Sequence, residues 1–135
     1  MAVKRFGVSL EGPLLKEFDK LIKRKGYANR SQAIRDLIRD LLVREAWEAG
    51  RGEVAGTITI VYRHDAYGIT KKLTEIQHKF LGKIVSSLHV HLDENHCLEV
   101  VVARGPADEI RKIADTLISA KGVLHGGMVA TGIAD

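Results

Sequence analysis

The sequence contains one cysteine, two prolines and few aromatic residues, and it has no long apolar run. One cysteine cannot form a disulfide within the chain, so we expect a reducing compartment, the cytoplasm. No apolar stretch approaches the roughly 18 residues of a membrane-spanning helix, and no segment resembles a signal peptide. The sequence also lacks glycine-rich phosphate-binding motifs, the HExxH zinc motif and the nucleophile elbow. These absences exclude a disulfide-rich secreted protein, a membrane protein and several common enzyme classes.

The composition is that of a globular protein, with 45% hydrophobic and 28% charged residues in a chain of 135. The net charge of +4 is unevenly distributed. Residues 1–50 contain 11 basic and 7 acidic side chains, whereas residues 51–135 contain 10 of each and hold all six histidines and the cysteine. Gly50 and Gly52 are typical of a linker. The sequence therefore predicts two domains, at 1–50 and 53–135, with the positive charge in the first.

The first part predicts a β-α-α unit. Residues 4–10 alternate between apolar and polar side chains, which is typical of a half-buried strand. A helix is expected from Pro13, which needs no amide partner at the first helical position, to Gly26. Asn29 and Gln32 have the spacing of a capping box for a second helix. A unit this small, with one strand, has nothing to pair with, so we expect two copies to dimerise through their strands.

The second part predicts alternating strands and helices. The expected order is strand 57–64, helix 69–83, strands 84–92 and 96–103, a helix from 105 to 122 and strand 123–131. This β-α-β-β-α-β order is the ferredoxin-like arrangement. The predicted fold class is therefore α+β.

A group of possible metal ligands lies in the central hairpin of this second part. His89 and His91 point to the same face of a strand because strand side chains alternate. A three-residue turn sets His91 opposite Cys97 and keeps the apolar residues Leu88 and Val90 on the other face. Two imidazoles and a thiol thus converge on one polar face, as in a mixed nitrogen and sulfur metal site. Such ligands suit zinc, copper and nickel, and the spacing does not decide among them.

The remaining histidines carry weaker signals. His78 lies about 200° around its helix from the core positions, so it faces either solvent or a neighbouring subunit. His64, His96 and His125 are interpreted as bystanders or outer partners of the site.

Two sets of residues resemble known families. The segment 27–36 (Tyr-Ala-Asn-Arg-Ser-Gln-Ala-Ile-Arg-Asp) resembles the entry into the second helix of ribbon-helix-helix DNA-binding domains. The second part resembles the NikR family of nickel-responsive repressors, whose domain is ACT-like, through three short stretches: Gln77-His78, Leu88-His89-Val90-His91 and Cys97-Leu98-Glu99. The resemblance covers essentially the whole chain.

The resemblance implies one Ni(II) per chain in a homotetramer that is a dimer of dimers. It places the nickel in a square plane. Three ligands come from one subunit, namely His89, His91 and Cys97, and the fourth, His78, comes from a facing subunit. It places hydrogen-bonding partners behind these ligands at Gln77 and Glu99, with Tyr62 and His64 nearby. The implied function is a repressor, not an enzyme, that binds operator DNA and controls nickel uptake.

The resemblance also implies a DNA-binding surface. Members of the family insert a two-stranded ribbon into the major groove. The outward residues of the expected strand are Arg5, Gly7 and Ser9. The first turn of the second helix, at Asn29, Arg30 and Ser31, is expected to hold a phosphate. Gly7 departs from the family pattern because it offers only backbone, so the operator sequence cannot be transferred.

Two other functions fit parts of the sequence. One is a ribbon-helix-helix regulator whose second domain senses another metal or a small organic ligand, with the histidines and cysteine incidental. The other is a small metal-dependent hydrolase, which would require an open position on the metal. Four protein ligands and the lack of a well-spaced general base argue against the hydrolase.

Overall fold

The computed structural model describes residues 2–50 and 52–133, and the chain divides into two compact units. The first unit is Met1–Arg39 and the second is Asp40–Asp135. The division lies within the helix α2 (Arg30–Glu48), so the last turns of this helix belong with the second unit. The domain ranges 1–50 and 53–135 remain a prediction based on the sequence.

The helices of the first unit begin and end where their local sequence predicts. The helix α1 (Gly12–Arg24) has a proline in its first turn, and Gly26 follows it with a φ of 83°, which only glycine adopts readily. At the start of α2, the side-chain oxygen of Asn29 accepts a hydrogen bond of 2.9 Å from the amide of Gln32. The Gln32 side chain accepts one of 3.1 Å from the amide of Ala28. The predicted cap is therefore present, with its return bond one residue earlier than in the standard capping box.

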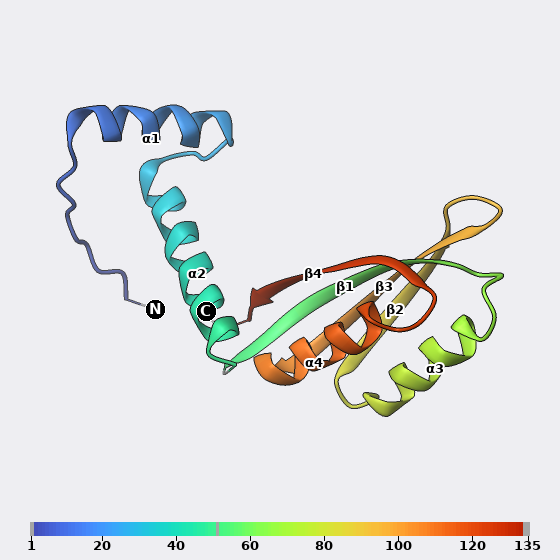
Figure 1. Ribbon diagram of the computed structural model, residues 1–135. Coiled ribbons are helices and arrows are strands. Elements are labelled where there is room, and N and C mark those ends of the chain that lie inside the picture. Colours follow the sequence, from blue (N-terminus) through green and yellow to red (C-terminus); the bar gives the residue numbers. More distant parts are fainter. Residues whose placement is uncertain (1, 51, 134–135) are drawn as a thin grey trace. The chain divides into compact units, whose positions relative to one another are not determined.

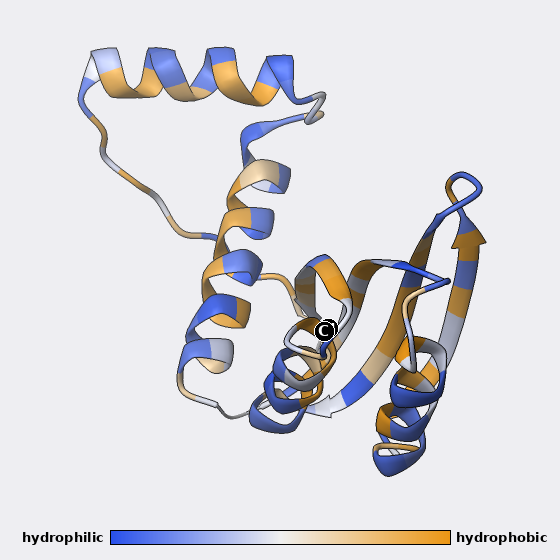
Figure 2. Cartoon of the chain, turned by 45° about the vertical axis from the view of Figure 1, so that its right-hand side comes forward, coloured by the Kyte–Doolittle hydropathy of each residue, from blue (hydrophilic) through white to orange (hydrophobic). Residues whose placement is uncertain are grey.

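The strand expected over residues 4–10 is not present in the single chain. Residues 2–10 have no regular secondary structure, and Phe6, Val8 and Leu10 are exposed. A strand needs a partner for its backbone groups, and the four strands of the described chain all lie in the second unit. Figure 2 shows apolar positions recurring along α1, yet this helix buries only Ile22. The first unit therefore leaves several apolar side chains exposed.

The second unit has the predicted β-α-β-β-α-β order, which confirms the fold class. Its elements are β1 (Glu53–Arg63), α3 (Ile69–Lys79), β2 (Ile84–His91), β3 (His96–Pro106), α4 (Ala107–Ile118) and β4 (Val123–Gly132). The strands form one antiparallel sheet in the order β2-β3-β1-β4, and both helices lie on the same side of it (Figure 1). None of the helices in the described residues is long and apolar enough to cross a membrane.

The core lies between the sheet and its two helices. Alternate residues of β1 and β3 point into it, and Tyr62 and Cys97 are paired neighbours in this buried layer. On the opposite face of the sheet, Leu88 and Val90 are exposed. The helices therefore cover the face that carries Cys97, and the apolar face predicted for the hairpin is the open one.

Candidate metal centre

The β2–β3 hairpin brings two of the predicted ligands together. His91 pairs with Cys97 and His89 pairs with Glu99, which confirms the register expected from a three-residue turn. The turn is fixed by the carboxylate of Asp93, which accepts hydrogen bonds of 2.8 Å from the amides of Asn95 and His96. The Asn95 amide first, and then the His96 side chain, lower the pKa of Asp93 to about 2. The turn thus sets which side chains face each other across the two strands.

Three possible ligands from one chain lie close together. The Nδ1 atom of His91 is 3.6 Å from the Sγ atom of Cys97. A ligand atom of His64 joins them, and the three atoms all lie within 4.8 Å of one another. His89 is not part of this group, although its ring centroid is 5.2 Å from that of His91 and 6.0 Å from that of Tyr62. Cys97 is fully buried and the three imidazoles are exposed, so the group is open to solvent on its histidine side.

The family resemblance placed His64 only near the site. The pairing of Tyr62 with Cys97 brings the end of β1 beside the hairpin, and His64 lies two residues beyond. The amide of His64 donates a hydrogen bond of 3.2 Å to the carbonyl of Asn95 in the hairpin turn. No spacing motif connects His64 with His91. Only the β1–β3 register reveals that they meet.

A buried carboxylate connects the sheet to α3 behind these ligands. Glu99 is only 7% exposed, and it accepts hydrogen bonds from the hydroxyl of Tyr62 at 3.1 Å and from the side-chain amide of Gln77. Burial, and then the negative charge of Glu99, raise the pKa of Tyr62 far above its ordinary value. Tyr62 is therefore a permanent donor at neutral pH. The structure brings together three of the four residues that the resemblance placed behind the ligands.

The fourth predicted ligand, His78, lies apart from this group. It is exposed on α3, on a surface that also includes Thr70 and Thr74. This agrees with its expected direction, away from the core of its own chain. Of the other histidines, His96 bonds the Asp93 carboxylate at 2.9 Å and His125 is exposed on β4.

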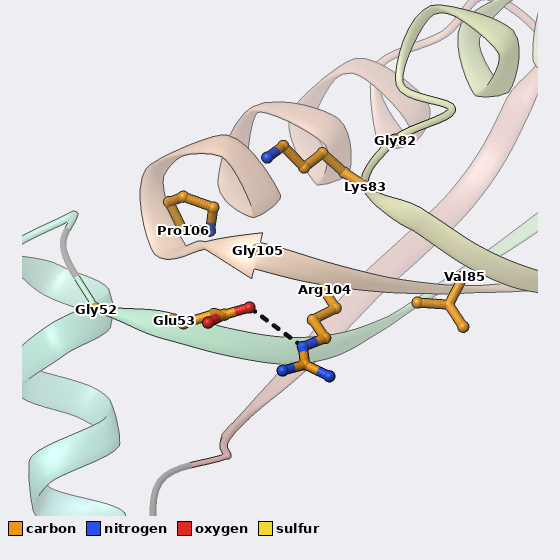
Figure 3. Close-up of a pocket in the computed structure, with 8 residues that line it drawn as sticks. All are labelled: Gly52, Glu53, Gly82, Lys83, Val85, Arg104, Gly105 and Pro106. Atoms are coloured by element: carbon orange, nitrogen blue, oxygen red, sulfur yellow. Dashed lines mark hydrogen bonds and ion pairs between the residues drawn. The ribbon is translucent and has the colours of Figure 1, made fainter.

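A pocket of about 550 Å³ lies at the other end of the sheet (Figure 3). Arg104 bonds Glu53 at 3.1 Å on one side of this pocket, and Lys83 pairs with Glu109 at 3.1 Å. The charged side chains that line it are therefore already paired, and its lining includes no histidine or cysteine. It gives little support to a second domain that senses a charged organic ligand.

The residues expected to contact DNA lie in the first unit. Arg5, Gly7 and Ser9 are in the exposed segment 2–10. Arg30 forms two hydrogen bonds of 2.8 and 2.7 Å with Asp19, which connect α2 to α1 and lower the pKa of that carboxyl. Asn29 caps α2, and Ser31 is exposed in its first turn. The role of these six residues in DNA binding remains a prediction.

Comparison with known families identifies both parts of the chain. Residues 55–131 match the model described as the NikR C terminal nickel binding domain, and residues 4–45 match that of the ribbon-helix-helix proteins of the copG family. Curated relatives include proteins named as nickel-responsive regulators. The one from Thermococcus onnurineus is 59% identical and covers 97% of this chain and 95% of its own length. The one from Pyrococcus furiosus is 57% identical and covers 97% of this chain and 95% of its own length. The one from Geobacter metallireducens is 56% identical and covers 94% of this chain and 91% of its own length.

A solved structure is similar in fold to part of this chain. An uncharacterized protein from Thermotoga maritima aligns with a TM-score of 0.52 at 21% identity, over 58% of this chain and 98% of that one. At this identity the likeness concerns the fold alone.

Proposed function

Because the chain belongs to the NikR family of nickel-responsive regulators, we propose that it represses nickel-uptake genes by binding operator DNA in its nickel-loaded state. A ribbon-helix-helix domain and a nickel-binding domain make it a regulator and not an enzyme. We place this function in the cytoplasm, where the operator DNA lies and where a free thiol such as Cys97 stays reduced.

The proposed nickel site combines residues of two subunits. His89, His91 and Cys97 of one subunit, with His78 of a facing subunit, would hold one Ni(II) per chain. The observation that carries this proposal is the 3.6 Å approach of His91 and Cys97 across the hairpin, with His89 on the same face. An imidazole and thiolate set suits nickel in a square plane. His78 is exposed on its helix, as a ligand offered to a neighbour must be.

Outer residues would orient these ligands. Glu99 lies opposite His89 in the register, and it is held by Tyr62 and Gln77. Gln77 precedes His78 on α3, so the same carboxylate supports both the strand and the helix that carry ligands. Partners of this kind fix the orientation of ligands, and their loss costs about 10–100-fold in metal affinity.

The proposed assembly is a homotetramer built as a dimer of dimers. The open face of the sheet exposes Leu88, Val90 and Val129, an apolar surface that another subunit would cover. In the first unit, Phe6 and Val8 are exposed on a segment that lacks a strand partner. Pairing of two such segments would give the ribbon that presents Arg5, Gly7 and Ser9 to the major groove.

Nickel would act by favouring the DNA-binding arrangement of this tetramer. For that coupling to exist, nickel must bind the DNA-competent state more tightly, and DNA must raise the nickel affinity by the same factor. A ligand from a facing subunit would supply this difference in nickel affinity, because nickel would gain the His78 ligand only where two subunits face each other.

The experiment is DNA binding by fluorescence anisotropy, with duplexes selected from random sequence in the presence of nickel. Wild-type protein should bind only with nickel, Cys97→Ala should not respond, and the exposed control His125→Ala should behave as wild type. If six to ten phosphates are contacted, the affinity should fall by about 10³–10⁵ between 50 and 200 mM salt. Nickel-independent binding, or an unchanged response in Cys97→Ala, would contradict the proposal.

Metal content is the complementary measurement. Elemental analysis should find one nickel per chain, and the absorption spectrum should contain the charge-transfer band of a square-planar nickel thiolate. Loss of that band in Cys97→Ala would identify the sulfur ligand. A protein that retains no metal would instead favour a regulator that senses an organic ligand.

A further inference from the structure

The net positive charge of the chain is concentrated in one short segment of the first unit. Residues 12–30, which contain α1 and the turn to α2, hold six basic and two acidic side chains. Because the whole chain has 21 basic and 17 acidic side chains, 15 of each lie outside this segment and cancel. The proposed DNA contacts use only Arg30 of the six. The other five basic residues of the segment are Lys16, Lys20, Lys23, Arg24 and Lys25.

Three of these lysines form one face of α1, called here the basic face. Lys16, Lys20 and Lys23 are exposed and line one open depression. At 100° per residue they fall within about 60° of one another, and their centre lies about 170° around the helix from that of the apolar residues. Figure 2 shows apolar and hydrophilic positions on separate sides of this helix. A dimer that covers the apolar side would therefore leave the basic face in solvent.

The carboxylates of the segment neutralise only part of this charge. Glu17 pairs with Lys20 at 3.6 Å, and Asp19 pairs with Arg30 at 2.7 Å. Among the described residues, no ion pair involves the other four basic side chains of the segment. The bond between Asp19 and Arg30 also connects the middle of α1 to the first residue of α2. The basic face thus lies beside the helix start where a phosphate contact is proposed.

The phosphate backbone of duplex DNA is the partner that this surface fits. From Lys16 to Lys23 the basic face extends about 10 Å along the helix axis, at 1.5 Å per residue. DNA carries one negative charge per about 1.7 Å of its own axis, so several phosphates lie within that length. The segment also belongs to the part of the chain that matches the ribbon-helix-helix proteins. Charge and position therefore both favour DNA over an acidic protein.

We propose that the basic face of α1, formed by Lys16, Lys20 and Lys23, binds the DNA backbone outside the base pairs that the ribbon contacts. Contacts to phosphates position a protein and add affinity, but they carry no sequence information. The basic face would therefore bind any duplex, with or without nickel, and would hold the protein on DNA before it reaches an operator. This inference rests on the proposed function only in taking DNA as the partner.

The experiment measures binding of the full-length, nickel-free protein to a duplex of scrambled sequence, by fluorescence anisotropy at several salt concentrations. The test variant combines Lys16→Gln, Lys20→Gln and Lys23→Gln. Each phosphate contact that is lost should reduce the slope of log affinity against log salt by about 0.9, and the affinity at 50 mM salt by about 10-fold. We therefore expect the variant to bind at least about 10-fold more weakly than wild type, with a shallower salt dependence.

Two sets of control variants test whether the effect depends on charge at this position. Arginine at the same three positions keeps the charge and should bind as wild type does. Glutamine at three exposed lysines of the second unit removes the same charge elsewhere and should keep the wild-type slope; these are Lys72, Lys112 and Lys121. Because glutamine and arginine are good helix formers, circular dichroism of all variants should match wild type.

The outcomes separate this inference from the proposed function. If the glutamine variant of the basic face keeps the wild-type affinity and slope, or if the arginine variant binds as weakly as the glutamine variant, the inference is wrong, while nickel-dependent operator binding can still stand. Nickel-independent binding to the selected duplex would contradict the proposed function, yet a loss of scrambled-duplex binding would still support the basic face. With nickel, the ratio of affinities for selected and scrambled duplexes should be unchanged in the glutamine variant. A lower ratio would indicate base contacts and overturn the assignment to the backbone.

Discussion

Removal of one hydroxyl group, in Tyr62→Phe, should destabilise the metal-free protein measurably. The hydroxyl is one of two side-chain donors to Glu99, whose carboxylate is 7% exposed. A hydrogen bond to a charged group contributes about 1.5–3 kcal/mol, and a buried carboxylate that loses a donor has no water to replace it. We therefore expect the free energy of unfolding to fall by about 1.5–3 kcal/mol.

The assay is urea unfolding, followed by circular dichroism at a fixed protein concentration because the chain is expected to associate. Tyr67→Phe is the matched control, since Tyr67 is fully exposed and the same hydroxyl is removed there. The control should change the free energy of unfolding by less than about 0.5 kcal/mol, as surface substitutions usually do. An effect of Tyr62→Phe no larger than that of the control would refute the assigned role of the hydrogen bond.

The pH dependence of the effect follows from the direction of the pKa shift. The pKa of Tyr62 is raised in the folded state by burial and by Glu99, so the folded protein favours the neutral phenol. The resulting stabilisation is fully present below the unfolded pKa of about 10 and is lost as pH rises through the higher folded pKa. The difference between wild type and Tyr62→Phe should therefore be constant from about pH 6 to 9 and shrink only in strong alkali.

Three other predictions concern a tightly packed glycine, the hairpin turn and the cap of α2. Gly126→Ala should cost about 1–3 kcal/mol in urea unfolding, because the added Cβ would lie 2.9 Å from Ile118 Cγ1, whereas Gly127→Ala meets no atom within 4 Å and should be neutral. The carboxyl of Asp93 should titrate near pH 2 when its titration is followed by NMR. Because its pKa is lowered in the folded state, the stabilisation that it gives the turn is present above the ordinary value of 3.8 and is lost as pH falls towards 2. A titration midpoint near 4 would contradict the hydrogen bonds of the turn. Asn29→Ala should destabilise α2 by about 1 kcal/mol, measured by thermal unfolding, and an unchanged midpoint would show that the cap contributes nothing.

The sequence predicted the local features of the fold well. Glycine and proline positions marked the ends of the helices, and alternation in the hairpin gave the pairing of His91 with Cys97. These features depend on residues close in the chain, where backbone preferences and side-chain periodicity dominate. The same reasoning placed His78 on the exposed side of α3.

Features that depend on distant or intermolecular contacts were harder to predict. Alternation of apolar and polar residues separates the two faces of a strand, but it does not say which face the helices of the same chain cover. In the β2–β3 hairpin the helices cover the face with Cys97, and Leu88 on the other face is exposed. The position of His64 follows from the pairing of β1 with β3, which joins residues far apart in the sequence. The strand expected over residues 4–10 has no partner strand in the first unit, and this segment has no regular secondary structure.

The division of the chain within α2 affects how the protein can be dissected. Residues from Asp40 onward belong with the second unit, where the Trp47 ring packs on the core and lies 4.6 Å from the guanidinium carbon of Arg111. A metal-binding fragment that starts at the linker glycines, Gly50 and Gly52, would lack this tryptophan and would expose the apolar surface beneath it. A fragment that starts at Asp40 would retain it. In an exchange of the ribbon-helix-helix part between relatives, a junction inside the helix, near Arg39, would likewise keep this tryptophan with the core on which it packs.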